Sequence, residues 1–170
     1  LNRAHFEPAV CVSKLGGKLD EEVRRLGIPL IEAQYYFTAK PYASLLLRVI
    51  KTAKQFKPYR FDLWHSFHYS DDYTEPLVAY FSGAKAWVYT KKNMNWYSNA
   101  WHLRSLLAKG IAAQNSDMLH DFFAGIFYRQ KTNLIPRGLD TEKFKPRQDG
   151  SQGLKALHGI DQGAVLVACV

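Results

Sequence analysis

Short apolar runs alternate with amphipathic stretches along most of this chain of 170 residues. Apolar runs bounded by turn residues predict buried strands, and they lie at 8–13, 29–33, 60–65, 85–90, 111–115 and 133–135. Apolar positions at helical spacing predict helices at 18–26, 42–56, 74–81 and 99–109, and a further helix capped by Ser116 or Asp117. This alternation predicts an α/β fold, namely a Rossmann-like three-layer α/β/α domain with a mostly parallel sheet.

The two ends of the chain carry different patterns. Residues 1–6 read as the tail of a helix, and 163–170 read as an intensely apolar strand after a polar stretch that contains a short helix. We expect residues 1–146 to form an amino-terminal domain that lacks its first strand. Residues 147–170 are then a linker and the first strand of a second, truncated domain.

The composition is that of a globular protein, with 47% hydrophobic and 14% aromatic residues. Cys11 and Cys169 lie in apolar runs far apart in sequence, which predicts buried free thiols in a reducing compartment. No apolar run reaches the ~18 residues of a membrane span, and no signal peptide opens the sequence. The net charge of +8 favours an anionic partner: nucleic acid, an anionic membrane surface or a phosphorylated small molecule.

Candidate site residues follow the strands, because ligands of open parallel sheets bind beyond the carboxyl ends of the strands. They are Gly16, Gly17, His65, His68, Thr90, Lys91, Lys92, Arg137 and Gly138. Helix amino termini in such loops favour phosphate or sugar hydroxyls. The chain contains no dinucleotide-binding, phosphate-loop, nucleophile-elbow or zinc-protease motif.

Each candidate has a structural alternative. Gly16-Gly17 also fits a tight turn, and Lys91-Lys92 also fits a pair of solvated side chains in a loop. Arg137 fits a solvated side chain, and Gly138 fits a backbone conformation that other residues resist. The two histidines fit three roles: hydrogen bonds within their loop, contact with a sugar or a proton, or a metal site completed by Asp71, Asp72 and Glu75.

Several segments, taken in order, resemble the amino-terminal half of family-4 glycosyltransferases. Phe61-Asp62-Leu63-Trp64-His65 is similar to the family's F-D-V-V-H strand. Residues 135–146, from Ile135-Pro136-Arg137-Gly138 to Phe144-Lys145-Pro146, are similar to its joining segment I-P-N-G-V-D-x-x-x-F-x-P. The runs 16–28, 86–90 and 111–116 also resemble family segments, so that the likeness extends over about residues 8–170.

The resemblance implies the amino-terminal half of a GT-B fold and transfer of a sugar with retention. The donor would be a UDP-, GDP- or ADP-sugar, with no tightly bound cofactor and no metal. The acceptor would be a glycan, a lipid-linked sugar or a small molecule, bound by this half with His65 or His68 lining the acceptor side. The catalytic acidic residues belong to the carboxyl-terminal domain of the full-length protein, so this chain alone is expected to be inactive.

The same resemblance implies a cytoplasmic enzyme, with peripheral association at the inner face of an anionic membrane. Two other functions stay open. One is a non-catalytic Rossmann-like module for an anionic ligand or nucleic acid, although no nucleic-acid motif is present. The other is a GT-B-like sugar-nucleotide epimerase.

Overall fold

The computed structural model describes residues 2–142, 144–145, 152–161 and 163–165. The chain divides into two compact units, Leu1–Pro136 and Arg137–Val170. In its described residues the second unit contains one helix, α7 (Gln152–Leu157). The predicted strand at 163–170 falls mostly outside the described residues, and Gly163, Ala164 and Val165 are not part of a strand.

The first unit contains both sheets. In chain order its elements are β1 (Val10–Val12), α1 (Asp20–Arg25), β2 (Leu30–Glu32), η1 (Tyr42–Ser44), α2 (Leu45–Lys54), η2 (Lys57–Tyr59), β3 (Leu63–Ser66), α3 (Thr74–Ser82), β4 (Ala86–Lys91), α4 (Ala100–Leu107), β5 (Gly110–Ala113), α5 (Ser116–Asp121), α6 (Ile126–Arg129) and β6 (Thr132–Leu134).

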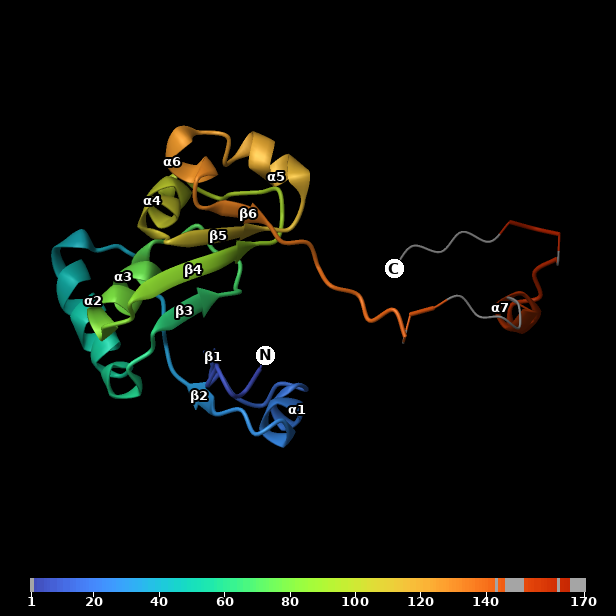
Figure 1. Ribbon diagram of the computed structural model, residues 1–170, viewed down its shortest axis with the longest axis horizontal. Coiled ribbons are helices and arrows are strands. Elements are labelled where there is room, and N and C mark those ends of the chain that lie inside the picture. Colours follow the sequence, from blue (N-terminus) through green and yellow to red (C-terminus); the bar gives the residue numbers. More distant parts are fainter. Residues whose placement is uncertain (1, 143, 146–151, 162, 166–170) are drawn as a thin grey trace. The chain divides into compact units, whose positions relative to one another are not determined.

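Every strand pairing in the described residues is parallel. One sheet has the order β1-β2 and the other has the order β3-β4-β5-β6 (Figure 1). The register pairs His65 with Val88 and Ser66 with Tyr89. The carboxyl ends of β3 and β4 therefore lie next to each other at one edge of the larger sheet.

All six predicted strands are present, and the predicted fold class is confirmed. The structure is an α/β fold with parallel sheets, consistent with a Rossmann-like three-layer domain. It differs from the sequence analysis in having two separate sheets instead of one. It also has a one-turn helix, α6, which is too short to show a helical period in the sequence.

Two local predictions are wrong because an asparagine forms the turn. The first is the helix predicted at residues 1–6. Asn2 Oδ1 accepts a hydrogen bond from Ala4 N at 2.9 Å, and residues 2–6 contain a turn before Pro8 and no helix. At α5 the cap is Asn115, not Ser116 or Asp117, because Asn115 Oδ1 accepts the Met118 amide at 3.0 Å. Both cases show the short amide side chain competing successfully for backbone donors.

The helix α3 ends as the sequence predicts. Gly83 follows it with φ of 97°, a left-handed conformation that favours glycine. Gly83 N donates to Tyr80 O at 3.0 Å and Ala84 N donates to Ala79 O at 3.1 Å, which satisfies carbonyls in the last turn. This stop leads the chain directly into β4.

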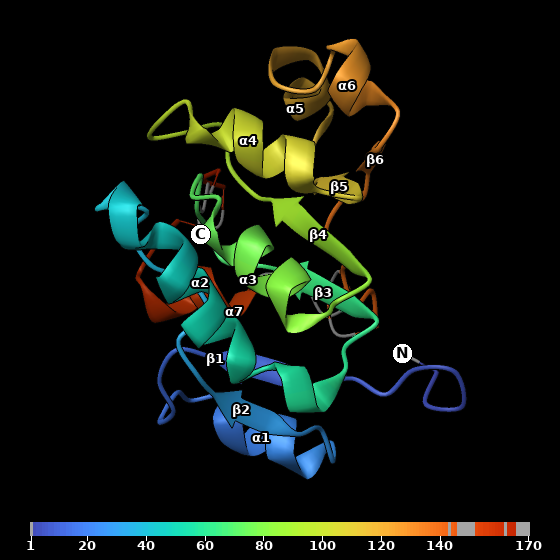
Figure 2. The same ribbon diagram turned by 90° about the vertical axis from the view of Figure 1, so that its left-hand side faces the viewer.

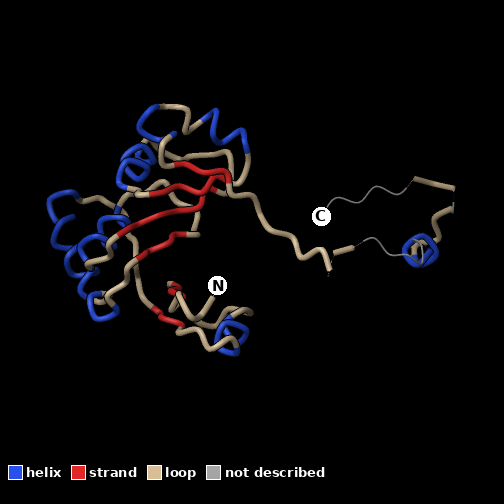
Figure 3. Tube along the Cα trace, viewed as in Figure 1, coloured by secondary structure: helices blue, strands red, loops and turns tan. Residues whose placement is uncertain are grey.

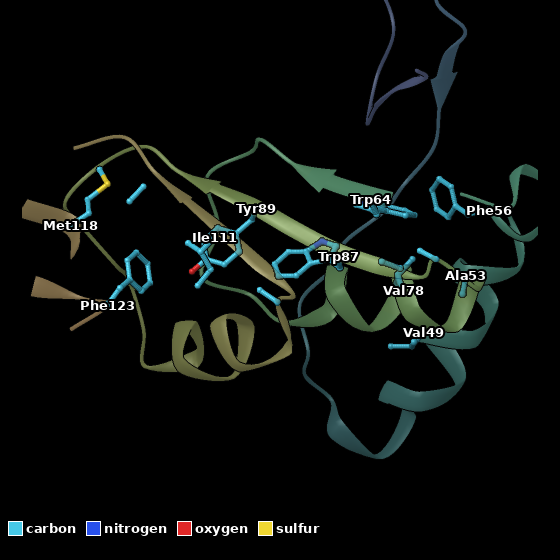
Figure 4. Packing of buried hydrophobic residues seen from close by; sticks show 14 residues of the cluster. Val49, Ala53, Phe56, Trp64, Val78, Trp87, Tyr89, Ile111, Met118 and Phe123 are labelled. Atoms are coloured by element: carbon cyan, nitrogen blue, oxygen red, sulfur yellow. The ribbon is translucent and has the colours of Figure 1, made fainter. Parts of the chain in front are cut away.

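The core lies between the larger sheet and the helices α2 and α3. Val49 and Ala53 from α2 and Val78 from α3 are at most 1% exposed, and they pack with Trp87 of β4 and Phe56 (Figure 4). Phe56 meets Trp64 of β3 edge-on at 4.8 Å between ring centroids. Aromatic rings therefore fill much of the space between the layers.

The helices α2, α3 and α4 lie on the same side of the β3–β6 sheet (Figures 1 and 2). Burial accordingly alternates along β3: Trp64 and Ser66 on the helix side are buried, whereas Leu63 and His65 on the opposite side are exposed. Figure 3 shows the four strands side by side with the helices against them. The alternation places His65 and Ser66 on opposite faces of one strand.

Cys11 is a free, half-buried thiol, as predicted. Burial raises its pKa to about 11, and its Sγ lies 4.0 Å from Ala33 O. Cys169 lies outside the described residues. No helix in the described ranges has the length and apolarity needed to cross a membrane.

Replacement of Phe56 by Ala is expected to lower the free energy of unfolding by about 3–5 kcal/mol, because it leaves a cavity in the core. Phe127 on α6 is 73% exposed and is the matched control. Phe127→Ala should change the same free energy by less than about 0.5 kcal/mol. Urea unfolding followed by circular dichroism measures both, and equal effects would contradict the location of the core.

Candidate functional site

Five of the predicted site residues come together where β3 and β4 end: His65, His68, Thr90, Lys91 and Lys92. His65 Nε2 lies 2.9 Å from Thr90 Oγ1, which joins the two strand ends by a hydrogen bond. His68 and Thr90 line the same small hollow at this edge of the sheet. The parallel register brings these residues together although they are far apart in sequence.

A buried ionic network lies on the helix side of the same strand ends. Glu75 of α3 and Arg104 of α4 are each 1% exposed. Arg104 Nη2 donates to Glu75 Oε2 at 3.0 Å. The Trp64 indole donates to Glu75 Oε1 at 3.1 Å and the Ser66 hydroxyl donates to Glu75 Oε2 at 2.8 Å, so both carboxylate oxygens have donors.

Arg104 ties this network to the adjoining loop. Its Nη2 also donates to Ser66 Oγ at 2.9 Å, and its Nη1 donates to the Asp72 carbonyl at 2.7 Å. The guanidinium lies 4.7 Å from the centre of the Trp87 ring and 5.2 Å from that of Tyr89. These contacts fix α4 and the loop before α3 relative to the sheet.

His68 connects the buried network to the surface. Its Nδ1 lies 3.1 Å from Ser66 Oγ and 3.4 Å from Glu75 Oε2. Its ring stacks on Tyr36 at 4.6 Å between centroids and meets Tyr35 edge-on at 5.4 Å. Desolvation lowers the pKa of His68 below its ordinary value of 6.5, although the Glu75 carboxylate acts in the opposite direction. The contact with Glu75 is therefore made by a neutral imidazole at pH 7.

The network also assigns the tautomer of His68. The Ser66 hydroxyl hydrogen is used toward Glu75, so Ser66 Oγ accepts from His68 Nδ1–H. His68 Nε2 is then an unprotonated acceptor. It is buried, and it has no hydrogen-bond partner in the part of the chain that the structure describes.

Lys91 and Lys92 differ in their surroundings. Lys91 is 2% exposed, so the solvated-loop alternative is wrong for this residue. Its Nζ donates to Asn93 Oδ1 at 3.0 Å and lies 3.7 Å from the centre of the Trp96 ring. Burial lowers the pKa of Lys91 to about 8, against the opposing effect of Asp71. Lys92 is exposed, with its Nζ 5.8 Å from the Phe67 ring.

The hollow at the strand ends is shallow. Its lining residues are His68, Tyr69, Ser70, Tyr89, Thr90, Lys91, Lys92 and Trp96. Its enclosed space is about 10 Å³, roughly that needed for one water molecule. A sugar or nucleotide would thus lie on this surface without being enclosed by it.

The remaining predicted residues lie elsewhere. Gly16 and Gly17 form a tight turn before α1, in which both amides donate to Asp20 Oδ2, at 2.7 and 3.2 Å. The tight-turn alternative is thus confirmed, and Asp20 occupies the amides that a phosphate would need. Arg137 and Gly138 belong to the second unit, so their predicted phosphate contact stays a prediction. Gly138 lacks a positive φ, so the special conformation predicted for it is wrong.

The sequence analysis missed the two central charges. Glu75 entered it only as a metal candidate, and Arg104 did not enter it at all. A charged residue within the apolar segment 99–109 is a weak signal that could have identified Arg104. In the described residues no group of three or more His, Cys, Asp or Glu side chains is arranged to hold a metal ion.

Comparison with known proteins shows a likeness in structure. No protein-family model and no curated protein matches this sequence. A crystal structure of a glycosyltransferase from Rickettsia africae ESF-5 is similar, with a TM-score of 0.63 and 17% sequence identity. The match covers 94% of this chain and 43% of that enzyme.

This chain shares the fold of the matched part of that enzyme. At 17% identity the likeness establishes the fold and not the substrates. The chain spans less than half the length of the enzyme that it resembles.

Replacement of Arg104 by Met should destabilise the first unit by about 3–5 kcal/mol, because Glu75 is left buried without its positive partner. The matched control is Lys85→Met, which removes a surface ion pair with Asp62 whose side chains are 79% and 77% exposed. We expect thermal unfolding to be unchanged in the control. An Arg104 variant as stable as the control would contradict the network.

Stability is also expected to fall as the pH is lowered through the histidine range. The unfolded chain binds a proton at His68 near pH 6.5, whereas the folded chain resists protonation because its pKa is lowered. The unfolded state therefore binds more protons, and the free energy of unfolding decreases from pH 7 toward pH 5.

His68→Gln should reduce this pH dependence only in part, because His65 has its pKa lowered by burial in the same way. His120→Gln, at an exposed position on α5, is the control. Chemical unfolding at a series of pH values measures the slope. A slope unchanged by His68→Gln would show that this histidine is not held neutral.

Proposed function

We propose that this chain is the acceptor-binding amino-terminal part of a retaining, family-4 glycosyltransferase of the GT-B type. The whole enzyme transfers a sugar from a UDP-, GDP- or ADP-sugar to a glycan, a lipid-linked sugar or a small molecule. The observation that carries this proposal is the buried, unpartnered Nε2 of a neutral His68, a residue that lines the hollow, in a chain that shares the fold of part of a glycosyltransferase.

In this proposal, His68 positions the acceptor. Its Nε2 accepts a hydrogen bond from an acceptor hydroxyl, which orients that oxygen for attack on the anomeric carbon of the donor. An unprotonated imidazole can also take up the hydroxyl proton as the bond forms. The Glu75–Ser66–His68 chain of hydrogen bonds keeps the ring in the required tautomer.

The two lysines contribute positive charge beside this position. Lys91 is largely protonated at pH 7, since its pKa is about 8, and it braces the loop that follows β4. Lys92 is exposed at the hollow and free to approach an anionic group of a substrate. Positive charge of this kind stabilises a departing diphosphate or a phosphorylated acceptor.

The small volume of the hollow supports an incomplete site. A space of about 10 Å³ cannot bury a nucleotide, whereas ligand pockets generally occupy about 300–1,000 Å³. Donor recognition therefore requires residues beyond this surface. We place these residues, with the catalytic acids, in a carboxyl-terminal domain that begins after residue 146, and we expect no turnover from this chain alone.

The proposal includes a cytoplasmic enzyme that meets lipid-linked acceptors at the anionic inner face of a membrane. The support is the net charge of +8. The bound donor serves as substrate, and no tightly bound cofactor takes part.

The test uses the full-length protein that contains this chain, with UDP-, GDP- and ADP-sugars and candidate acceptors. We expect the nucleotide to be released only when an acceptor is present. We also expect the anomeric configuration of the product, measured by NMR, to be the same as that of the donor sugar. His68→Ala should lower kcat/KM about 100-fold or more, because it removes the hydroxyl acceptor.

His120→Ala is the control, since His120 is exposed on α5 and does not line the hollow. It should retain the activity of the unaltered protein. Transfer that persists in His68→Ala would contradict the role of this histidine. Failure of every nucleotide sugar to react would contradict the proposed function itself.

A further inference from the structure

Two exposed aromatic rings border the hollow. Phe67 follows β3 directly and is 55% exposed, and Tyr97 in the loop after β4 is 80% exposed. Phe67 is reached by Lys92, whose Nζ lies 5.8 Å from its ring, and Tyr97 lies 5.1 Å from Tyr69 between centroids. Lys92 and Tyr69 both line the hollow, so each of the two rings contacts a residue of its lining.

Both rings are supported from below. The Phe67 ring packs on His65 at 4.0 Å between centroids, and His65 is itself bonded to Thr90. Tyr97 rests against Tyr69, whose hydroxyl donates to the Asn95 carbonyl at 3.0 Å. Exposure alone does not mark a ligand site, since the chain has other exposed rings such as Phe127 and Tyr42; the position of these two rings beside the hollow distinguishes them. A supported ring also loses little conformational entropy when a ligand binds.

The lining of the hollow combines aromatic rings with a few polar groups. His68 Nε2 needs a hydrogen-bond donor, and the hydroxyls of Ser70 and Thr90 line the same surface. A pyranose ring matches this arrangement, because it has an apolar C–H face for stacking and hydroxyls around its edge. A surface too shallow to enclose a ring suits a saccharide that lies flat across it.

We propose that Phe67 and Tyr97 are stacking platforms for a saccharide acceptor, whose hydroxyl reaches His68. This rests on the proposed function, and it names the acceptor as a sugar chain that is bound across the strand ends. A nucleobase, which also stacks on aromatic rings, is the competing ligand and is included in the test.

The test measures binding to the full 170-residue chain by saturation-transfer NMR and titration. The probes are disaccharides of glucose, galactose, mannose and N-acetylglucosamine, with uridine and inorganic phosphate for comparison. We expect at least one disaccharide to bind, with the strongest transfer to its ring C–H protons. Phe67→Ala and Tyr97→Ala should each weaken that binding about five- to tenfold.

Two matched controls separate stacking from general exposure of aromatic rings. Phe127→Ala on α6 and Tyr42→Ala at the start of η1 remove rings that are 73% and 62% exposed and do not line the hollow. They should leave the disaccharide affinity unchanged, and all four variants should keep the melting temperature. Equal weakening by the controls, preferential binding of uridine, or no binding of any disaccharide would overturn the proposal.

Sugar transfer by the full-length protein distinguishes this proposal from the proposed function. If Phe67→Ala and Tyr97→Ala transfer sugar with the same KM for the acceptor as the unaltered protein, the stacking role of the two rings is overturned and the proposed function is not. If disaccharide binding depends on both rings but the full-length protein transfers no sugar, the stacking role is supported and the proposed function is rejected.

Discussion

The pairing of Glu75 with Arg104 is the interaction on which the first unit depends. Both side chains are 1% exposed, and two charges removed from water in this way need hydrogen bonds from their surroundings. Three residues supply them here: Trp64 and Ser66 on β3, and Asp72 through its carbonyl in the loop before α3. Among the described residues, only the buried Nε of Arg104 in this pair has no partner. One ion pair thereby fixes two helices, a strand and a loop in a single arrangement.

The chemistry at the surface follows from this buried pair. Because the Ser66 hydroxyl is directed to Glu75, His68 must donate through Nδ1, and its Nε2 is left as an acceptor. Desolvation keeps the ring neutral at pH 7 despite the nearby carboxylate. The position of the proton on the His68 ring is thus determined by the pair of helices, α3 and α4, that supplies Glu75 and Arg104. The core and the site are parts of one hydrogen-bonded network, so changes in one are expected to alter the other.

The surface at the strand ends combines three kinds of group: a neutral acceptor at His68, exposed rings at Phe67 and Tyr97, and the positive charge of Lys92. None of these alone identifies a ligand. Together they favour a molecule with an apolar face, hydroxyl groups and a nearby anionic group, which a sugar acceptor and a departing nucleotide would supply. In the proposed function, this shallow surface positions the acceptor, and residues beyond it complete the transfer reaction.

The amino-acid sequence alone determined the order of the strands and helices, the parallel α/β fold class and the edge of the sheet where His65, His68 and Thr90 lie. Hydrophobic periodicity and glycine stops such as Gly83 are local signals, so a single sequence is enough to detect them. Only the tertiary structure decided that Arg104 meets Glu75 and that Lys91 is enclosed by aromatic rings. These pairings join residues whose distance in space has no trace in local periodicity, and burial then changes their hydration and their protonation.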